Sequence, residues 1–169
     1  MFSQLLKQSR EFLQLQIIEL HLQTRCDCFL KKCIFGMSEL LDKSALNMNA
    51  AEYLLKEGHY DSVCHPAYYS CFQLMKHKVC HSMHIDYEAQ EREIVSSRQN
   101  THQYTIKKIA DYIEQKEGAW VAQQFNRDIR DLKKHRENSD YKIIRLGRDT
   151  CEACVSLAKH IYLTISRTL

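Results

Sequence analysis

Glycine and proline are scarce in this sequence: only four glycines and one proline occur among its 169 residues. Sheets, hairpins and long loops depend on these residues for their turns, whereas helix interiors exclude them. The sequence therefore predicts an all-α fold. Apolar residues make up 44% of the chain and charged residues 27%, so there is enough apolar material for the core of one globular domain without disulfides.

Apolar residues recur at helical spacing over most of the chain, and the interruptions mark the expected helix ends. Gly36, Gly58 and Gly118 each follow a periodic stretch. The single proline, Pro66, falls in the first turns of a helix and predicts a ragged or kinked start. The polar residues 84–100 predict a loop or lid with some helix. The expected helices, which form a bundle of five or six, cover about residues 1–35, 38–56, 61–83, 104–115, 119–136 and 149–166.

The chain is weakly basic, with a formal net charge of +3 and nine histidines that can add charge at lower pH. This balance permits an RNA or nucleotide partner without requiring one. No uncharged apolar run is long enough to cross a membrane, and the first residues lack the pattern of a signal peptide. We therefore expect a cytoplasmic protein with no membrane partner.

Two groups of cysteines are spaced closely enough to be candidate zinc ligands. One contains Cys26, Cys28 and Cys33, and the other contains Cys151 and Cys154. A structural zinc ion needs four ligands that converge, usually from two close pairs. Cys151 and Cys154 lie three residues apart inside an apolar helical run, which favours a place in the core. We therefore expect buried thiols in a reducing compartment, and neither a metal nor another cofactor.

The stretch from Arg130 to Tyr141 concentrates cationic, acidic and histidine side chains near the end of the expected fifth helix. An arginine can hold a phosphate and stabilise the negative charge that develops on it. A histidine such as His135 can take or give a proton near neutral pH. Together these groups are sufficient to cleave RNA without a metal. The simpler interpretation is a solvated helix end, where cations are favoured near the last carbonyl groups.

Four segments resemble the HEPN domains, in the order in which that family carries them. Residues 50–61 and 67–72 are similar to the opening helix pair, with its Leu-Leu-x-x-Gly-x-Tyr-like turn and its Ala-Tyr-Tyr-Ala-x-Phe segment. Residues 101–102, Thr-His, are similar to the Ser/Thr-His that follows the family's variable loop. Residues 136–141, Arg-Glu-Asn-Ser-Asp-Tyr, resemble the Arg-x-x-Ala-Asp-Tyr signature of one branch of small HEPN proteins, with Ser139 in place of the usual alanine.

This resemblance covers about residues 38–169 and implies an up-and-down helical bundle that forms homodimers. We therefore expect a HEPN-like domain over residues 37–169, preceded by an N-terminal helical extension over residues 1–36. Many HEPN domains are metal-independent ribonucleases of toxin–antitoxin, CRISPR and RNA-defence systems, and others pair with a nucleotidyltransferase. The expected partners are accordingly RNA or a nucleotide, a second copy of the chain, and an antitoxin or a nucleotidyltransferase.

The family's active motif implies one set of site residues: an arginine, often followed by a polar residue, with a histidine four to six residues after the arginine. Arg130, Asp131 and His135 match this pattern literally. On a continuous helix Arg130 and His135 lie about 140° apart, so one subunit would not aim both at one phosphate. A two-fold dimer could bring one copy of each together, so catalysis by this pair implies a homodimer.

The branch signature implies a second set, in which Arg136 is the family arginine. The histidine position then falls near Asp140 or Tyr141, and no histidine is present there. Arg136 and Asp140 are four residues apart on one helix face and could instead form a salt bridge that fixes the helix end. In this second alignment the domain would bind a nucleotide or a partner protein.

Three further residues are candidates for binding through the resemblance. Tyr68 and Tyr69 occupy the paired-tyrosine position of the family, and we expect one in the core and the other at the cleft. His102 could cap the fourth helix or reach the cleft.

The sequence thus predicts RNA cleavage, or RNA or nucleotide binding, at a dimer cleft. In the cleavage hypothesis His135 is the acid–base, and Arg130 or Arg136 stabilises the phosphate. The alternative is a non-catalytic binding or interaction module, such as an accessory partner of a nucleotidyltransferase.

Overall fold

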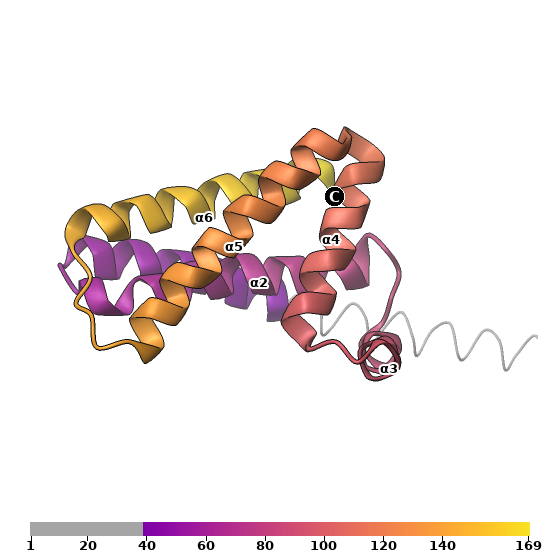
Figure 1. Cartoon of the computed structure of the whole chain (residues 1–169), viewed down its shortest axis with the longest axis horizontal. Helices are drawn as coiled ribbons and strands as arrows, with labels where there is room; N and C mark the ends of the chain where they lie inside the picture. The colour runs from indigo at the N-terminus through magenta and orange to yellow at the C-terminus, as the bar shows by residue number, and fades with distance from the viewer. Residues whose placement is uncertain (1–38) are drawn as a thin grey trace, which may run out of the picture. The chain divides into compact units, whose positions relative to one another are not determined.

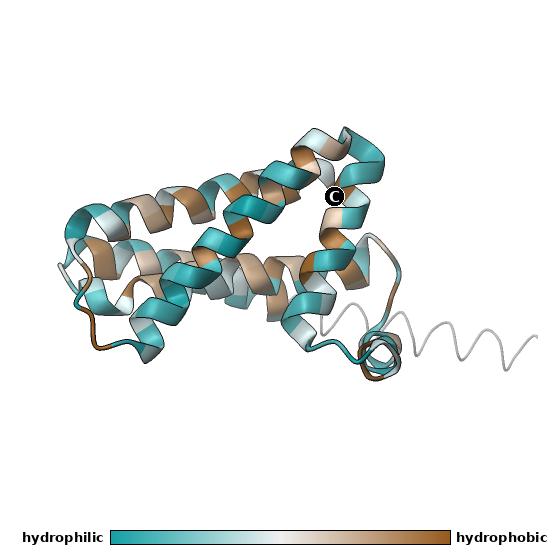
Figure 2. Cartoon of the chain, in the orientation of Figure 1, coloured by the Kyte–Doolittle hydropathy of each residue, from teal (hydrophilic) through white to brown (hydrophobic). Residues whose placement is uncertain are grey.

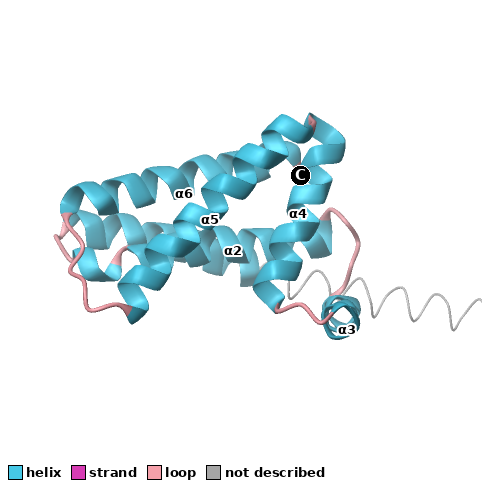
Figure 3. Cartoon of the chain, viewed as in Figure 1, coloured by secondary structure: helices cyan, strands magenta, loops and turns pink. Residues whose placement is uncertain are grey.

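The computed structural model describes residues 39–169, which belong to one compact unit of the chain, Met37–Leu169. This part contains helices and loops and no strand, so the predicted all-α fold is confirmed (Figure 3). The N-terminal extension predicted over residues 1–36, with the first group of cysteines, lies outside the described residues. The helices cover residues 39–56 and then α2 (Cys64–His81), α3 (Tyr87–Ser97), α4 (Thr101–Glu117), α5 (Ala119–Tyr141) and α6 (Arg148–Thr168), with a 3-10 turn, η1 (Tyr60–Ser62), before α2.

The central element of the bundle is α2, which packs against α4, α5 and α6. Figure 1 shows α6 running along the same direction as α2, α5 crossing obliquely, and α4 standing steeply across one end. The helices α4 and α5 pack closely on each other and are joined at Gly118, whose φ of +91° suits glycine. The start of α4 and the second half of α5 therefore both lie beside α2.

The core consists of apolar side chains that face inward from α2, α4, α5 and α6, together with Ala51 from the helix over residues 39–56. Figure 2 shows interrupted apolar stripes on otherwise polar helices. Fully burying such a side chain stabilises the fold by about 1.5–3 kcal/mol relative to leaving it exposed. The largest fully buried side chains are Tyr68, Phe125, Leu74, Met75, Ile109, Ile113, Ile129, Leu132, Ile161, Ile165, Val63 and Val79.

The second cysteine group belongs to this core, as predicted. Cys151 and Cys154 are both fully buried on α6. Burial raises the pKa of the Cys151 thiol to about 12, so it stays protonated, and its Sγ donates a hydrogen bond to the carbonyl oxygen of Tyr60 at 3.2 Å. Within residues 39–169, no group of three or more histidine, cysteine or acidic side chains is arranged to hold a metal ion.

Several helix boundaries differ from the predicted ones for local reasons. Asn100 and Gln103 form a capping box, which starts α4 three residues earlier than expected. The Asp86 carboxylate accepts a hydrogen bond from the backbone N–H of Ala89, and this cap begins α3 inside the polar stretch. The ragged start expected near Pro66 is confirmed, because the 3-10 turn η1 precedes α2.

The largest difference is at the end of α5, which continues to Tyr141, five residues beyond the predicted end. Ser139 and the loop after α5 are attached to η1: the Ser139 hydroxyl donates to the carbonyl oxygen of Asp61, and the Asp61 carboxylate accepts from the N–H of Leu146 at 2.9 Å.

No described helix is long and apolar enough to span a bilayer.

Candidate functional site

Six of the nine predicted site residues gather where α2, α4 and the end of α5 meet. Two tyrosines, Tyr68 and Tyr69, come from the second turn of α2, and His102 comes from the first turn of α4. The last turns of α5 supply Arg136, Asp140 and Tyr141. A seventh residue, His65, joins them from the start of α2. We call this group the Arg136 cluster, and its members are His65, Tyr68, Tyr69, His102, Arg136, Asp140 and Tyr141.

Arg136 is the centre of the cluster and is buried, with 8% of its side chain exposed. Its guanidinium carbon lies 5.1 Å from the centre of the Tyr68 ring, 5.7 Å from Tyr69 and 5.8 Å from Tyr141. A cation is attracted by the faces of aromatic rings at such distances, and more strongly where water is removed. Burial alone lowers the pKa of Arg136, but Tyr69, Asp140 and Tyr68 raise it on balance, so the guanidinium stays charged.

The hydrogen bonds of Arg136 are few and long for so buried a cation. Its Nη1 donates to the Asp140 carboxylate at 3.4 Å and to the Tyr141 hydroxyl at 3.5 Å, whereas charge-assisted bonds are usually near 2.8 Å. Its Nε is buried and has no hydrogen-bond partner among the described residues. The donors of this guanidinium are therefore far from saturated, and the aromatic faces together with Asp140 compensate for the water that it has lost.

Asp140 is shared between Arg136 and His65. The His65 Nδ1 lies 3.1 Å and 3.2 Å from the two carboxylate oxygens of Asp140, and its ring lies 4.6 Å from that of Tyr69. Sequence reasoning missed His65 as a member of the site. The signal was its spacing: His65 is three residues before Tyr68 and four before Tyr69, so the three side chains lie on one face of α2.

His102 reaches the cluster from the first turn of α4, and Asn100 supplies the cap of that helix instead. The Nδ1 of His102 is 2.8 Å from the Tyr68 hydroxyl, and its ring is stacked on Phe72 with 4.1 Å between ring centres. Burial lowers the pKa of His102, and the nearby charge of Arg136 lowers it further. The imidazole is therefore neutral at pH 7.

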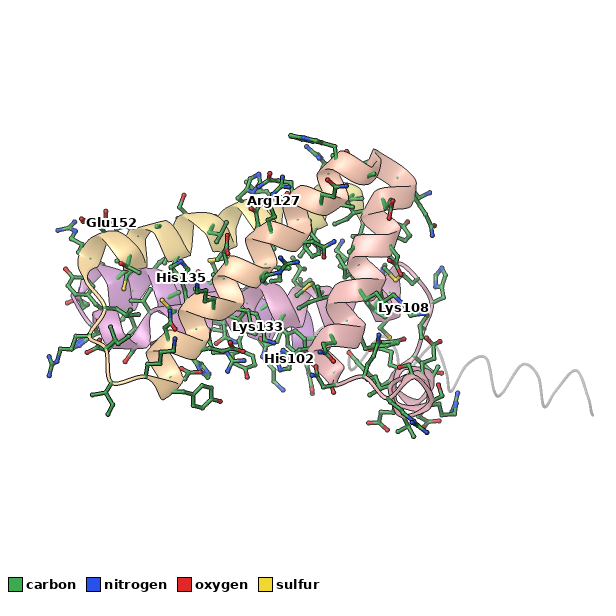
Figure 4. All side chains as sticks on the ribbon, viewed as in Figure 1. His102, Lys108, Arg127, Lys133, His135 and Glu152 are labelled. Atoms are coloured by element: carbon green, nitrogen blue, oxygen red, sulfur yellow. The ribbon has the colours of Figure 1, made fainter. Side chains whose placement is uncertain are left out.

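Two lysines add positive charge beside His102. Lys133 on α5 and Lys76 on α2 both lower the pKa of His102, while Glu137 opposes them. Lys133 is paired with Glu137 at 3.5 Å and keeps 32% of its side chain exposed. Figure 4 shows Lys133 on the side of α5 that faces the start of α4, where His102 lies. The site thus combines cations with aromatic rings, which suits an anion attached to a planar group.

The three remaining predicted residues lie outside the cluster. Arg130 and Asp131 are exposed on α5, and His135 is half-buried. None of the three forms a hydrogen bond or ion pair with another residue of the described part of the chain. Figure 4 places His135 on the opposite side of α5 from Lys133. Because α5 is one continuous helix, Arg130 and His135 point about 140° apart and do not meet within one chain.

Ser139 connects the end of α5 to η1. The Ser139 hydroxyl donates to the carbonyl of Asp61, which attaches the last turn of α5 to η1. This bond holds Asp140 and Tyr141 next to the start of α2.

No protein-family model matches this chain, and neither the curated proteins nor the solved structures contain a detectable relative.

Proposed function

We propose that this chain is a HEPN-like protein that binds RNA or a nucleotide through the Arg136 cluster. The observation that carries the proposal is the unsaturated guanidinium of Arg136, which is surrounded by aromatic rings. Two lysines near His102 add positive charge to the same part of the molecule. Arginine recognises phosphate with several parallel hydrogen bonds, and lysine adds attraction as a point charge.

Tyr141 supplies a surface for a base. Its hydroxyl is 3.5 Å from Arg136, yet 76% of the residue is exposed, so one ring face remains open to solvent. Stacking of a base on an exposed aromatic ring contributes about 1–3 kcal/mol to single-strand binding. A phosphate near Arg136 and a base on Tyr141 would then belong to one nucleotide.

The test is fluorescence anisotropy with a labelled single-stranded RNA and the full chain. Because Tyr141 and Lys133 are partly exposed, Tyr141→Ala and Lys133→Ala should fold normally and weaken binding, each by about fivefold or more. Lys134→Ala removes a neighbouring exposed lysine outside the cluster and is the matched control. Equal affinity for all four proteins, or no binding by the wild type, would show that the cluster is not the site.

A second candidate function, an interaction module, is favoured by the loop after α5. Ile143 is fully exposed and Ile144 is 56% exposed, next to the exposed ring of Tyr141. Apolar side chains displayed together at the surface are typical of a protein contact. A second copy of the chain is the partner that the HEPN resemblance implies. If this loop forms the dimer, sedimentation should show a concentration-dependent dimer that Ile143→Ser abolishes, and an unchanged dimer would refute the role of the loop.

A further inference from the structure

The connection between α5 and α6 displays apolar and cationic side chains together at one end of the bundle. Residues 141–145, Tyr-Lys-Ile-Ile-Arg, are all exposed, and we call them the 141–145 loop. Ile143 is fully exposed and Ile144 is 56% exposed. Figure 2 shows the apolar (brown) part of this loop at the end of the bundle away from α3. Two adjacent isoleucines in water are unfavourable for the isolated chain, so they point to a partner.

Hydrogen bonds at both ends hold the loop in this exposed form. The backbone N–H of Lys142 donates to the carbonyl oxygen of Asn138 at 3.2 Å, which closes α5. The backbone N–H of Leu146 donates to the Asp61 carboxylate at 2.9 Å. Only residues 143–145 lie between these two attachments. The isoleucines therefore cannot turn back into the core unless one of the bonds breaks.

A cation stands on each side of the isoleucines. Lys142 and Arg145 are exposed, and neither forms an ion pair with another residue of the part that the structure describes. Among the nearby carboxylates, Asp61 and Asp140 are engaged in hydrogen bonds, and Asp149 lies in the first turn of α6, where the helix dipole offsets its charge. The loop thus presents an apolar tip within positive charge.

We infer that the 141–145 loop binds the surface of an anionic membrane. Ile143 and Ile144 would enter the boundary between headgroups and acyl chains, where leaving water is favourable, and Lys142 and Arg145 would contact anionic headgroups. No described helix spans a bilayer, and this mode of binding requires none. The inference departs from the expectation of no membrane partner, which rested on the absence of a spanning segment.

The composition of the loop favours a lipid surface over the two other kinds of partner. A two-fold contact between copies, centred on the loop, would bring the cations of both copies together, and like charges at close range repel each other. A nucleic acid would satisfy the cations but not the isoleucines, because bases stack on aromatic rings and arginine. An anionic membrane accounts for both kinds of side chain.

The experiment is co-sedimentation of the full chain with phospholipid vesicles. We expect binding to vesicles made of equal parts phosphatidylcholine and phosphatidylserine, and binding at least about tenfold weaker to phosphatidylcholine alone. Ile143→Ser should weaken binding to the anionic vesicles by about tenfold or more, because less apolar surface leaves water. Val95→Ser is the matched control, since Val95 is 78% exposed on α3, and it should bind like the wild type.

Two further readouts test the cations and the insertion of the loop. Lys142→Glu and Arg145→Glu should each weaken binding by about fivefold or more, whereas Lys107→Glu, at an exposed position of α4, should not. Trp120 is the only tryptophan of the chain and lies at the far end of α5. In a Trp120→Phe chain, Ile144→Trp should show a blue shift of its emission with anionic vesicles, while the emission of Trp120 in the wild type should not change.

The outcomes separate the membrane from the other partners. A wild type that does not sediment with anionic vesicles would overturn the inference, and so would equal binding by Ile143→Ser, because charge alone would then adsorb the chain. A concentration-dependent dimer that Ile143→Ser abolishes, without vesicle binding, would assign the loop to a second copy. The RNA proposal is tested separately: Ile143→Ser should bind RNA like the wild type, and a loss of RNA affinity without vesicle binding would assign the loop to the nucleic acid.

Discussion

Replacing Arg136 with alanine tests how much the aromatic cluster contributes to folding, and its effect can be worked out from the contacts. Three ring faces within 6 Å of the guanidinium are each worth about 0.5–1 kcal/mol. Asp140 loses the guanidinium but keeps its contact with His65, and 19% of its side chain is exposed. The loss of this ion pair therefore costs about 1 kcal/mol rather than the full cost of a buried unpaired charge.

One contribution has the opposite sign. The buried Nε of Arg136 has no partner among the described residues, and removing an unsatisfied donor returns about 1 kcal/mol. The net expectation is that Arg136→Ala lowers the free energy of unfolding by about 2 kcal/mol. For a chain of this size that corresponds to a fall in Tm of about 4–8 °C.

The assay is urea unfolding followed by circular dichroism at the helix band, with Arg130→Ala as the matched control. Arg130 lies on the same helix, is exposed, and makes no ion pair with the described residues, so its removal should change stability by less than about 0.5 kcal/mol. If Arg136→Ala is as stable as Arg130→Ala, the attraction between the guanidinium and the rings makes no net contribution, and the reasoning fails.

Three other predictions concern stability. The pKa of His102 is lower in the folded chain than in the unfolded one, so the unfolded chain binds more protons. The free energy of unfolding should therefore fall as the pH decreases below about 6.5. Urea titrations at pH 7.5 and 5.5 should show this loss, and the loss should be smaller for His102→Gln. Phe125→Ala, at a core position 2% exposed, should cost about 3–5 kcal/mol in chemical denaturation, while Trp120→Ala, at a position 73% exposed on the same helix, should cost about 0.5 kcal/mol or less. Asn100→Ala should cost about 1 kcal/mol by removing the cap of α4, and an unchanged midpoint would deny the cap any net effect.

The helical architecture was predictable because it follows from patterns that repeat along the chain. The scarcity of glycine and proline excluded sheets, and Gly58 and Gly118 marked two helix ends that the structure confirms. The less accurate boundaries depended on particular side-chain hydrogen bonds, such as the bond from Ser139 to Asp61 at the end of α5 and the caps of α3 and α4. Asp86 and Asn100 each begin a helix by accepting a hydrogen bond from a backbone N–H, and the spacing of apolar residues does not predict such bonds.

The site was predictable in part, for a similar reason. Residues on one helix, such as Arg136 and Asp140, have a relation fixed by helical geometry, and the pair that was expected is present. The contact between Tyr68 and His102 joins residues 34 positions apart, and it depends on how α4 crosses α2. A literal motif such as Arg130 with His135 satisfies a spacing rule, but the helix directs its members to different sides.

The Arg136 cluster is shared by three helices, and this has a thermodynamic consequence. Its members come from α2, α4 and α5, so the complete arrangement exists only when the bundle is assembled. A ligand that needs the whole arrangement binds the folded chain and not the unfolded one. At a concentration one hundred times its Kd, such a ligand raises the unfolding free energy by about 2.7 kcal/mol. Thermal stability in the presence of candidate anions is therefore a direct measure of what the site recognises.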